Sequence, residues 1–149
     1  MKVLPTLEGG LRLTIEHPLE WEVLAMVEKD AHGSVSDQLC ELMDEDAMWE
    51  DLIKPDLDET FRAQISTIEK NLRSAKKEDD EEVVIEPEGA EGWYGALNQA
   101  RLNLERRYKL HKLRDEGDLE VLEEEVRGAF FRDRFYCHLQ TVILDYVME

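Results

Sequence analysis

The chain has few residues that turn or cross-link a fold, with 8 Gly, 4 Pro and 2 Cys among 149 residues. So few turn-forming residues argue against a sandwich of many short strands. Cys40 and Cys137 lie far apart within helical patterns, so they indicate no disulfide framework and no metal cluster. No apolar run approaches the roughly 18–20 residues of a membrane span, and Pro5 and Glu8 interrupt any signal-peptide run. We therefore expect a protein of the cytoplasm, with no membrane partner.

The signatures of catalytic and metal sites are absent from the sequence as well. It contains no P-loop, no GxGxxG, GxSxG, HExxH or CxxC motif and no EF-hand loop. The four histidines show no paired metal spacing, and no Glu precedes a His by three residues. The sequence thus indicates no metal and no cofactor. No enzyme class gains positive support, which favours a non-enzymatic role and leaves activity open.

Acidic residues dominate the charge, with 36 Asp and Glu against 18 Lys and Arg and a net charge of −18. Phosphate backbones repel such a chain, so we expect no nucleic acid partner. Two interpretations stay open: the acids decorate solvated helix faces, or they form an acidic surface for a basic partner. Trp49 lies in the acidic stretch 43–51, which makes it a candidate interface residue.

The first residues predict a β-hairpin. Runs 3–7 and 11–15 flank Gly9 and Gly10, which suit a tight turn, and the second run alternates apolar and polar residues. Pro5 cannot donate to a ladder, which makes the first strand an edge strand. A lone hairpin is marginal in water, so residues 83–85 are a candidate third strand.

Helical periodicity dominates the rest of the chain. His17 and Pro18 predict a helix start and Gly33 its end. The clearest amphipathic segment has apolar residues at helical spacing, namely Leu57, Phe61, Ile65, Ile68, Leu72 and Ala75. A later helix runs through Trp93 to about Lys112. For a last helix, from about Phe130 to Met148, we expect an inward face of Phe131, Phe135, Leu139, Val142, Tyr146 and Val147.

Together these elements predict a mainly α fold, a single-domain helical bundle of roughly five to seven helices with a small N-terminal β-hairpin. We expect one domain over residues 1–149. It divides into a hairpin (1–16), N-terminal helices (17–77), an acidic linker with a short strand (78–86) and C-terminal helices (87–149).

The helix through Trp93 carries the candidate binding residues. Its core stripe is Trp93, Leu97, Ala100 and Leu104, with Asn98 and Arg101 on the neighbouring stripe. Buried polar groups need partners, so this pair locks neighbouring helices together, or it faces a groove and binds a carboxylate or phosphate. Gln140 on the last helix is a candidate partner of either residue in both interpretations.

The end of this helix is basic. Residues 101–114 hold six Lys or Arg and one acid. Cations are favourable near a helix C-terminus, which explains much of the cluster without a function. The other interpretation makes Arg106 and Arg107 candidate interface residues for a partner.

Residues 91–104, preceded by Val84-Ile85, resemble a bacterial family known only as a domain of unknown function (number two-zero-one-seven). The shared pattern, Trp-x-x-Ala-Leu-Asn-x-x-Arg-Leu and then Leu-Gln on a C-terminal helix, falls here on Trp93, Ala96, Leu97, Asn98, Arg101, Leu102 and Leu139-Gln140. The resemblance covers mainly residues 83–147, and the charged extension at Arg106-Arg107 departs from it. It implies no assigned activity. The genes of this family often lie near the gene of the adaptor for the Clp protease, which implies a regulatory or proteolysis-linked role.

The leading hypothesis is a non-enzymatic interaction or adaptor module of the bacterial cytoplasm with a protein partner. Its contact surface would combine the acidic N-terminal half with a groove beside Asn98 and Arg101. The alternative is an enzyme or small-molecule binder that grips an anion with Arg101, Asn98 and Gln140. A homo-oligomer joined through the hairpin edge or the last helix is a third hypothesis.

Overall fold

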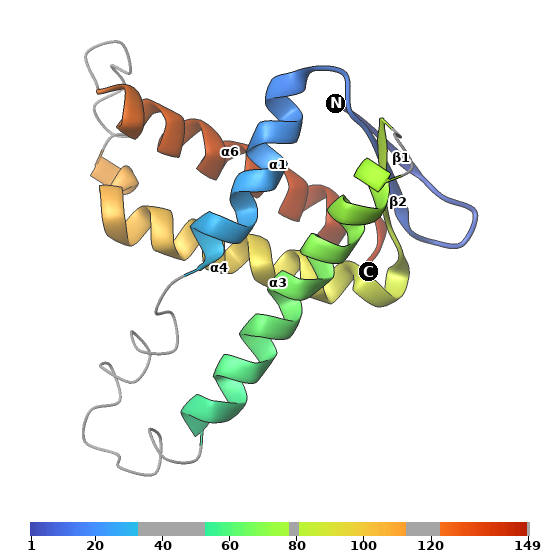
Figure 1. Cartoon of the computed structure of the whole chain (residues 1–149), viewed down its shortest axis with the longest axis horizontal. Helices are drawn as coiled ribbons and strands as arrows, with labels where there is room; N and C mark the ends of the chain where they lie inside the picture. The colour runs from blue at the N-terminus through green and yellow to red at the C-terminus, as the bar shows by residue number, and fades with distance from the viewer. Residues whose placement is uncertain (33–52, 78–80, 113–122, 149) are drawn as a thin grey trace.

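The structure is a computed structural model that describes residues 1–32, 53–77, 81–112 and 123–148 (Figure 1). The helices form a bundle with a small sheet at one end, which confirms the mainly α fold with an N-terminal hairpin. In chain order the elements are β1 (Lys2–Pro5), β2 (Leu11–Thr14), α1 (Pro18–Ala31), α3 (Lys54–Lys77), β3 (Glu82–Ile85), the 3-10 helix η2 (Pro87–Gly89), α4 (Ala90–Tyr108) and α6 (Glu124–Tyr146).

The three strands form an antiparallel sheet in the order β1-β2-β3, so residues 83–85 do supply the third strand. Leu13 pairs with Val3 on one side and Val83 on the other. Gly10 has no room for a side chain, because a Cβ there would lie 2.2 Å from the carbonyl oxygen of Ile85. One face of the sheet is buried through Leu11, Leu13, Val83 and Ile85, and this face adjoins the helices.

Helix α1 begins as the sequence predicts. His17 accepts a hydrogen bond from the backbone N–H of Leu19, and the Glu20 carboxylate accepts from the N–H of His17 at 3.0 Å, which completes a capping box after Pro18 at the first helical position. The helix ends at Ala31, directly before the C-cap His32. Leu19 is 56% exposed, so the first turn extends beyond the core, which begins at Val23.

Helix α4 is the centre of the bundle, and α1, α3 and α6 all pack against it (Figure 1). Its predicted core stripe is confirmed, because Trp93, Leu97, Ala100 and Leu104 are all buried. Two glycines bring α3 close. A Cβ at Gly95 would lie 2.3 Å from the Gln64 amide, and one at Gly92 would lie 2.8 Å from the Thr67 hydroxyl. The Trp93 indole N–H donates across this contact to Asn71 Oδ1 at 2.7 Å.

Two predictions about helices are wrong. Helix α4 ends at Tyr108 and not near Lys112, because Lys109 adopts the left-handed conformation with φ 51°. Helix α6 begins earlier than expected, and its predicted inward face is confirmed only in part: Phe131 is 56% exposed and Tyr146 63% exposed, whereas Phe135, Val142 and Val147 are partly buried against the core. Of the expected inward residues only Leu139 is buried on α6, beside Ala129, Asp133, Tyr136, Gln140 and Ile143. Asp133 and Gln140, which both accept hydrogen bonds from Arg101, lie on the buried face of α6, where an apolar pattern would place hydrophobic residues.

Candidate functional site

Two buried carboxylates join α6 to its neighbours. The first is Asp30, near the end of α1, whose side chain is 6% exposed. Arg132 of α6 binds it with both arms of its guanidinium, from Nε to Oδ2 at 2.7 Å and from Nη2 to Oδ1 at 3.2 Å. The Tyr136 hydroxyl donates to Oδ2 at 2.6 Å. The Asn103 side chain of α4 donates to the Asp30 carbonyl oxygen at 3.0 Å, so three helices meet at one residue.

This environment changes the acid–base behaviour of both donors. Burial, the charge of Asp30 and the hydrogen bond to it raise the pKa of Tyr136 far above its usual value, so the phenol stays protonated. Burial alone would lower the pKa of Arg132, but the hydrogen bond and charge of Asp30 outweigh it and raise that pKa. The cluster is thus a fully bonded ion pair with a neutral phenol.

The second carboxylate is Asp133 of α6, with a side chain 2% exposed. Arg101 of α4 donates to it from Nε at 3.1 Å, and from Nη1 to Gln140 Oε1 at 2.8 Å. Gln140 in turn donates to the carbonyl oxygen of Tyr94 at 3.3 Å. The structure therefore brings Arg101 and Gln140 together and makes them a lock between α4 and α6.

The third member of the expected group, Asn98, does not join them. It is exposed on α4, while Arg101 is directed into the contact with α6. Four surface pockets lie among the described residues without Arg101, Asn98 or Gln140 in their linings. Because an internal acid and an amide already occupy the Arg101 guanidinium, its geometry argues against the anion-binding hypothesis and favours the helix-locking one.

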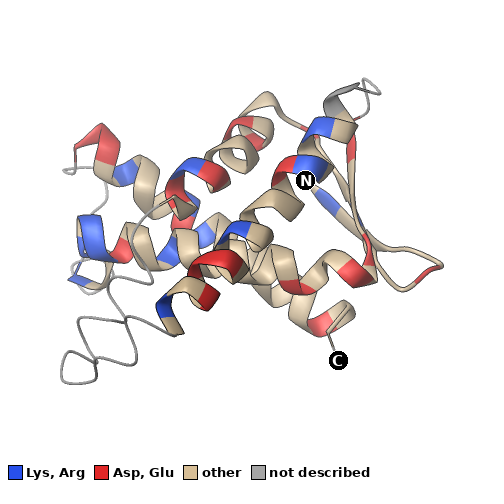
Figure 2. Ribbon diagram, turned by 60° about the horizontal axis from the view of Figure 1, so that its bottom comes forward, with Lys and Arg blue, Asp and Glu red and all other residues tan. Residues whose placement is uncertain are grey.

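A surface pocket of about 310 Å³ lies where the ends of α1 and α4 meet. Asp30 and Asn103 belong to its lining, and Lys29, His32, Arg106 and Arg107 surround them. An adjoining pocket of about 400 Å³ shares Lys29, His32 and Arg107. Figure 2 shows the basic colour of the last turn of α4 at one end of the molecule, in a chain of net charge −18. We call Lys29, His32 and Arg107 the basic cluster.

Local sequence explains why the basic cluster forms. Lys29 lies in the last turn of α1, and Arg106 and Arg107 lie in the last turn of α4, where the helix dipoles favour cations. Lys29, His32 and Arg107 are all exposed. The pairing of Asp30 with Arg132 neutralises one acid of the pocket lining, while a second acid, Glu28, lines the adjoining pocket beside the cluster.

Sequence reasoning named Arg106 and Arg107 as interface candidates, and both line the pocket. Trp49 lies outside the described residues. Asp30, Arg132, Tyr136 and Asp133 were not predicted, although Arg101, the partner of Asp133, was. A signal for them existed, because Asp30 continues the stripe of Val23 and Val27 at a step of three. An acid at a core position predicts a buried partner on another element.

Among the described residues, none of the helices combines the length and apolar character that a bilayer crossing requires. In the same part of the chain, His, Cys, Asp and Glu side chains form no group of three or more that could hold a metal ion.

The fold and its two buried ion pairs define a helical bundle with a small antiparallel sheet at one end. The family profile described as a domain of unknown function (DUF2017) matches residues 41–146. That match spans more than half of the chain, so the protein belongs to this family, as the pattern on α4 and α6 predicts. No curated protein and no solved structure gives a match.

Proposed function

We propose that this member of the family is a protein-interaction module that binds an acidic segment of a partner protein at the basic cluster. The observation that carries the proposal is the pair of adjoining pockets, which share Lys29, His32 and Arg107. Opposite charges across an interface speed encounter and select partners. Outside the basic cluster the chain is mainly acidic, so it repels an acidic segment everywhere else on its surface. The link to regulation or proteolysis that the resemblance implies belongs to the same proposal.

The buried network supports this surface in a second way. Asp30 lines the pocket and is bonded to Arg132, Tyr136 and, through its carbonyl, Asn103. These bonds hold the ends of α1 and α4 in a fixed relation, so the helices that carry the basic cluster need little rearrangement when a partner binds. Binding sites that are ordered in advance lose less entropy on association.

A pair of charge-reversed variants tests the proposal. The double variant Lys29→Glu, Arg107→Glu removes the cluster, and the matched control Lys2→Glu, Arg12→Glu makes the same charge change on the exposed face of the sheet. We expect a fluorescent glutamate- and aspartate-rich peptide to bind the wild type and the control, more tightly at low salt. The cluster variant should lose at least about tenfold in affinity, or 1.4 kcal/mol. Equal affinity for both variants contradicts the proposal.

A further inference from the structure

An apolar hollow adjoins the basic cluster. It has a volume of about 260 Å³ and lies between the end of α1 and the first half of α3. Ala31, Phe61 and Ile65 supply its apolar lining, and His32, Arg62 and Asp58 supply polar atoms. A hollow of this kind, apolar with a few polar groups at its edge, is typical of a pocket for one anchoring side chain.

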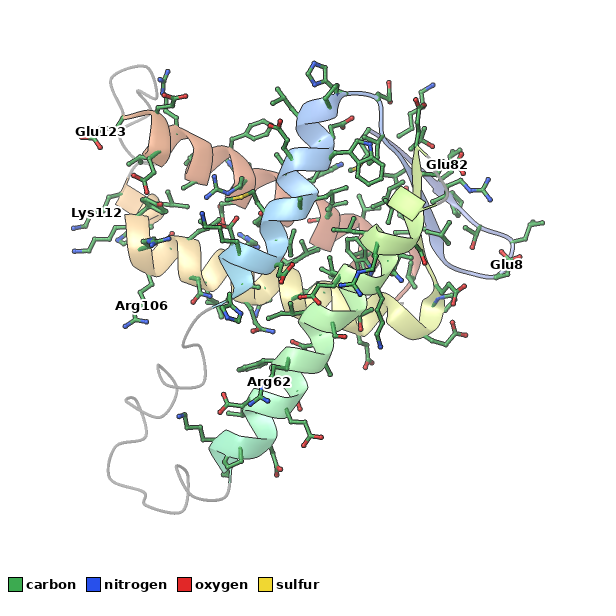
Figure 3. All side chains as sticks on the ribbon, in the orientation of Figure 1. Glu8, Arg62, Glu82, Arg106, Lys112 and Glu123 are labelled. Carbon is green, nitrogen blue, oxygen red and sulfur yellow. The ribbon has the colours of Figure 1, made fainter. Side chains whose placement is uncertain are left out.

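His32 connects the hollow with the basic cluster. It lines the pocket between α1 and α4, the adjoining pocket on α1, and the hollow beside α3. Figure 3 shows Arg62 on α3 and Arg106 at the end of α4 on the same side of the molecule. The three spaces therefore meet at His32, with apolar side chains on the α3 side and Lys29 and Arg107, beside the acid Glu28, on the other side.

The hollow is fixed by hydrogen bonds from α4. Gln99, which is buried, donates to the carbonyl oxygen of Phe61 at 3.2 Å and to Gln64 Oε1 at 2.9 Å. Gly95 lets the two helices approach at this level. The position of Phe61 relative to α4 is thus set within the fold before any partner binds.

We propose that the acidic partner segment also carries a large apolar side chain, leucine or phenylalanine, which fills the hollow while its acidic neighbours face Lys29, His32 and Arg107. This inference rests on the proposed function and names the chemistry of the partner. Charge complementarity orients the segment, because the hollow carries one acid, Asp58, and one base, Arg62, whereas Lys29 and Arg107 on its other side attract the acidic residues. An apolar anchor beside charged contacts is a common way to recognise a peptide.

Three labelled probes test the inference by fluorescence anisotropy with the full chain. The first is a peptide with a central leucine between glutamates and aspartates, the second has serine in place of the leucine, and the third is single-stranded oligothymidine. We expect the leucine peptide to bind about tenfold or more tightly than the serine peptide, since burial of one leucine side chain is worth that factor. Oligothymidine that binds as tightly as the leucine peptide overturns the inference.

A variant at Phe61 tests whether the leucine side chain of the peptide binds in the hollow. Phe61→Ala should weaken the leucine peptide to the level of the serine peptide and leave the serine peptide unchanged. Its fold is checked by circular dichroism. A second measurement avoids any effect on folding: a photoreactive leucine in the peptide, bound to the wild type, should cross-link to residues that line the hollow. Cross-links elsewhere overturn the inference.

The outcomes separate the two proposals. If leucine and serine peptides bind equally and both lose affinity in Lys29→Glu, Arg107→Glu, the anchor is wrong and the proposed function stands. If the leucine peptide binds that variant as tightly as the wild type and cross-links to the hollow, the basic cluster is wrong and the hollow stands. If none of the acidic peptides binds, both are overturned.

Discussion

Helix α6 is joined to the bundle by two polar contacts of opposite sense. Toward α1 it presents the base, Arg132, to the acid Asp30; toward α4 it presents the acid, Asp133, to the base Arg101. The two α6 residues are neighbours in sequence, so one turn of helix reaches both partners. A rotation of α6 about its axis breaks both contacts at once, and together they fix its orientation.

The surroundings of the two contacts differ. The contact at Arg101 is enclosed between two helices and ends in an amide, Gln140. The contact at Asp30 involves two donors from α6 and lines an open pocket with a basic rim. Similar chemistry therefore serves two purposes: the contact at Arg101 joins helices, and the contact at Asp30 also shapes a surface.

The largest effect is expected from Asp30→Ala. It leaves Arg132 without its carboxylate and Tyr136 with only the carbonyl oxygen of Val23 at 3.3 Å as acceptor. Loss of one partner of a buried ion pair costs about 3–5 kcal/mol. Because the Arg132 side chain remains 18% exposed, we expect about 3 kcal/mol, at the low end of that range. Urea denaturation measures the loss.

A double variant separates the unpaired charge from the pair itself. Asp30→Leu with Arg132→Leu removes both charges, and buried pairs replaced by apolar residues often cost little. It should therefore be more stable than Asp30→Ala. A double variant as unstable as the single one shows that the geometry of the pair, and not the stranded charge, matters.

A smaller effect is expected from Asp133→Ala. Here Arg101 is 28% exposed and keeps its bond to Gln140, so water and the amide offset part of the loss. We expect about 2 kcal/mol, within the range for a hydrogen bond to a charged group. The surface pair Arg12–Glu82, at 3.4 Å, is the control: Arg12→Ala should cost less than about 1 kcal/mol. A larger loss of stability in Asp133→Ala than in Asp30→Ala would contradict this ranking.

The smallest effect is expected in the pH dependence of stability, which distinguishes the contact at Asp30 from the contact at Arg101. The pKa of Tyr136 is raised by burial and by Asp30, whereas in the unfolded chain a tyrosine ionises near pH 10. The folded state then holds a proton that the unfolded state has lost, so stability is full below about pH 10 and falls above it. The slope is at most about 1.4 kcal/mol per pH unit.

Urea denaturation from about pH 8 to pH 11 should show a shallower decline for Tyr136→Phe than for the wild type. Tyr108→Phe is the control. A hydrogen bond with Glu125 raises the pKa of Tyr108, but this contact lies at the surface, so its removal should change the slope less. Parallel slopes for wild type and Tyr136→Phe would show that the phenol does not retain its proton.

The parts of the fold that depend on local pattern could be predicted from the sequence. Gly9 and Gly10 marked the hairpin, His17 and Pro18 marked the start of α1, and the apolar stripe through Trp93 marked the buried face of α4. Each of these signals acts within a few residues, through backbone conformation or helical period.

Long-range pairing could not be predicted in the same way. Asp30 and Arg132 are 102 residues apart, and nothing local to either residue names its partner. The sequence did suggest Gln140 as a partner of Arg101, but Asp133 was missed for the same reason, because it looks like a surface residue until Arg101 is placed beside it. The pocket needs the ends of α1 and α4 together, and that is a property of the packed fold.

The order of strands in the sheet has a consequence for what counts as a folding unit. The family match starts at residue 41, after β1, β2 and α1, whereas β3 lies within it and pairs with β2. A fragment of residues 41–146 would leave β3 without β2, its only strand partner among the described residues, and Arg132 without Asp30. We therefore expect the matched segment to be unstable on its own, because residues 1–32 complete both its sheet and its buried ion pair.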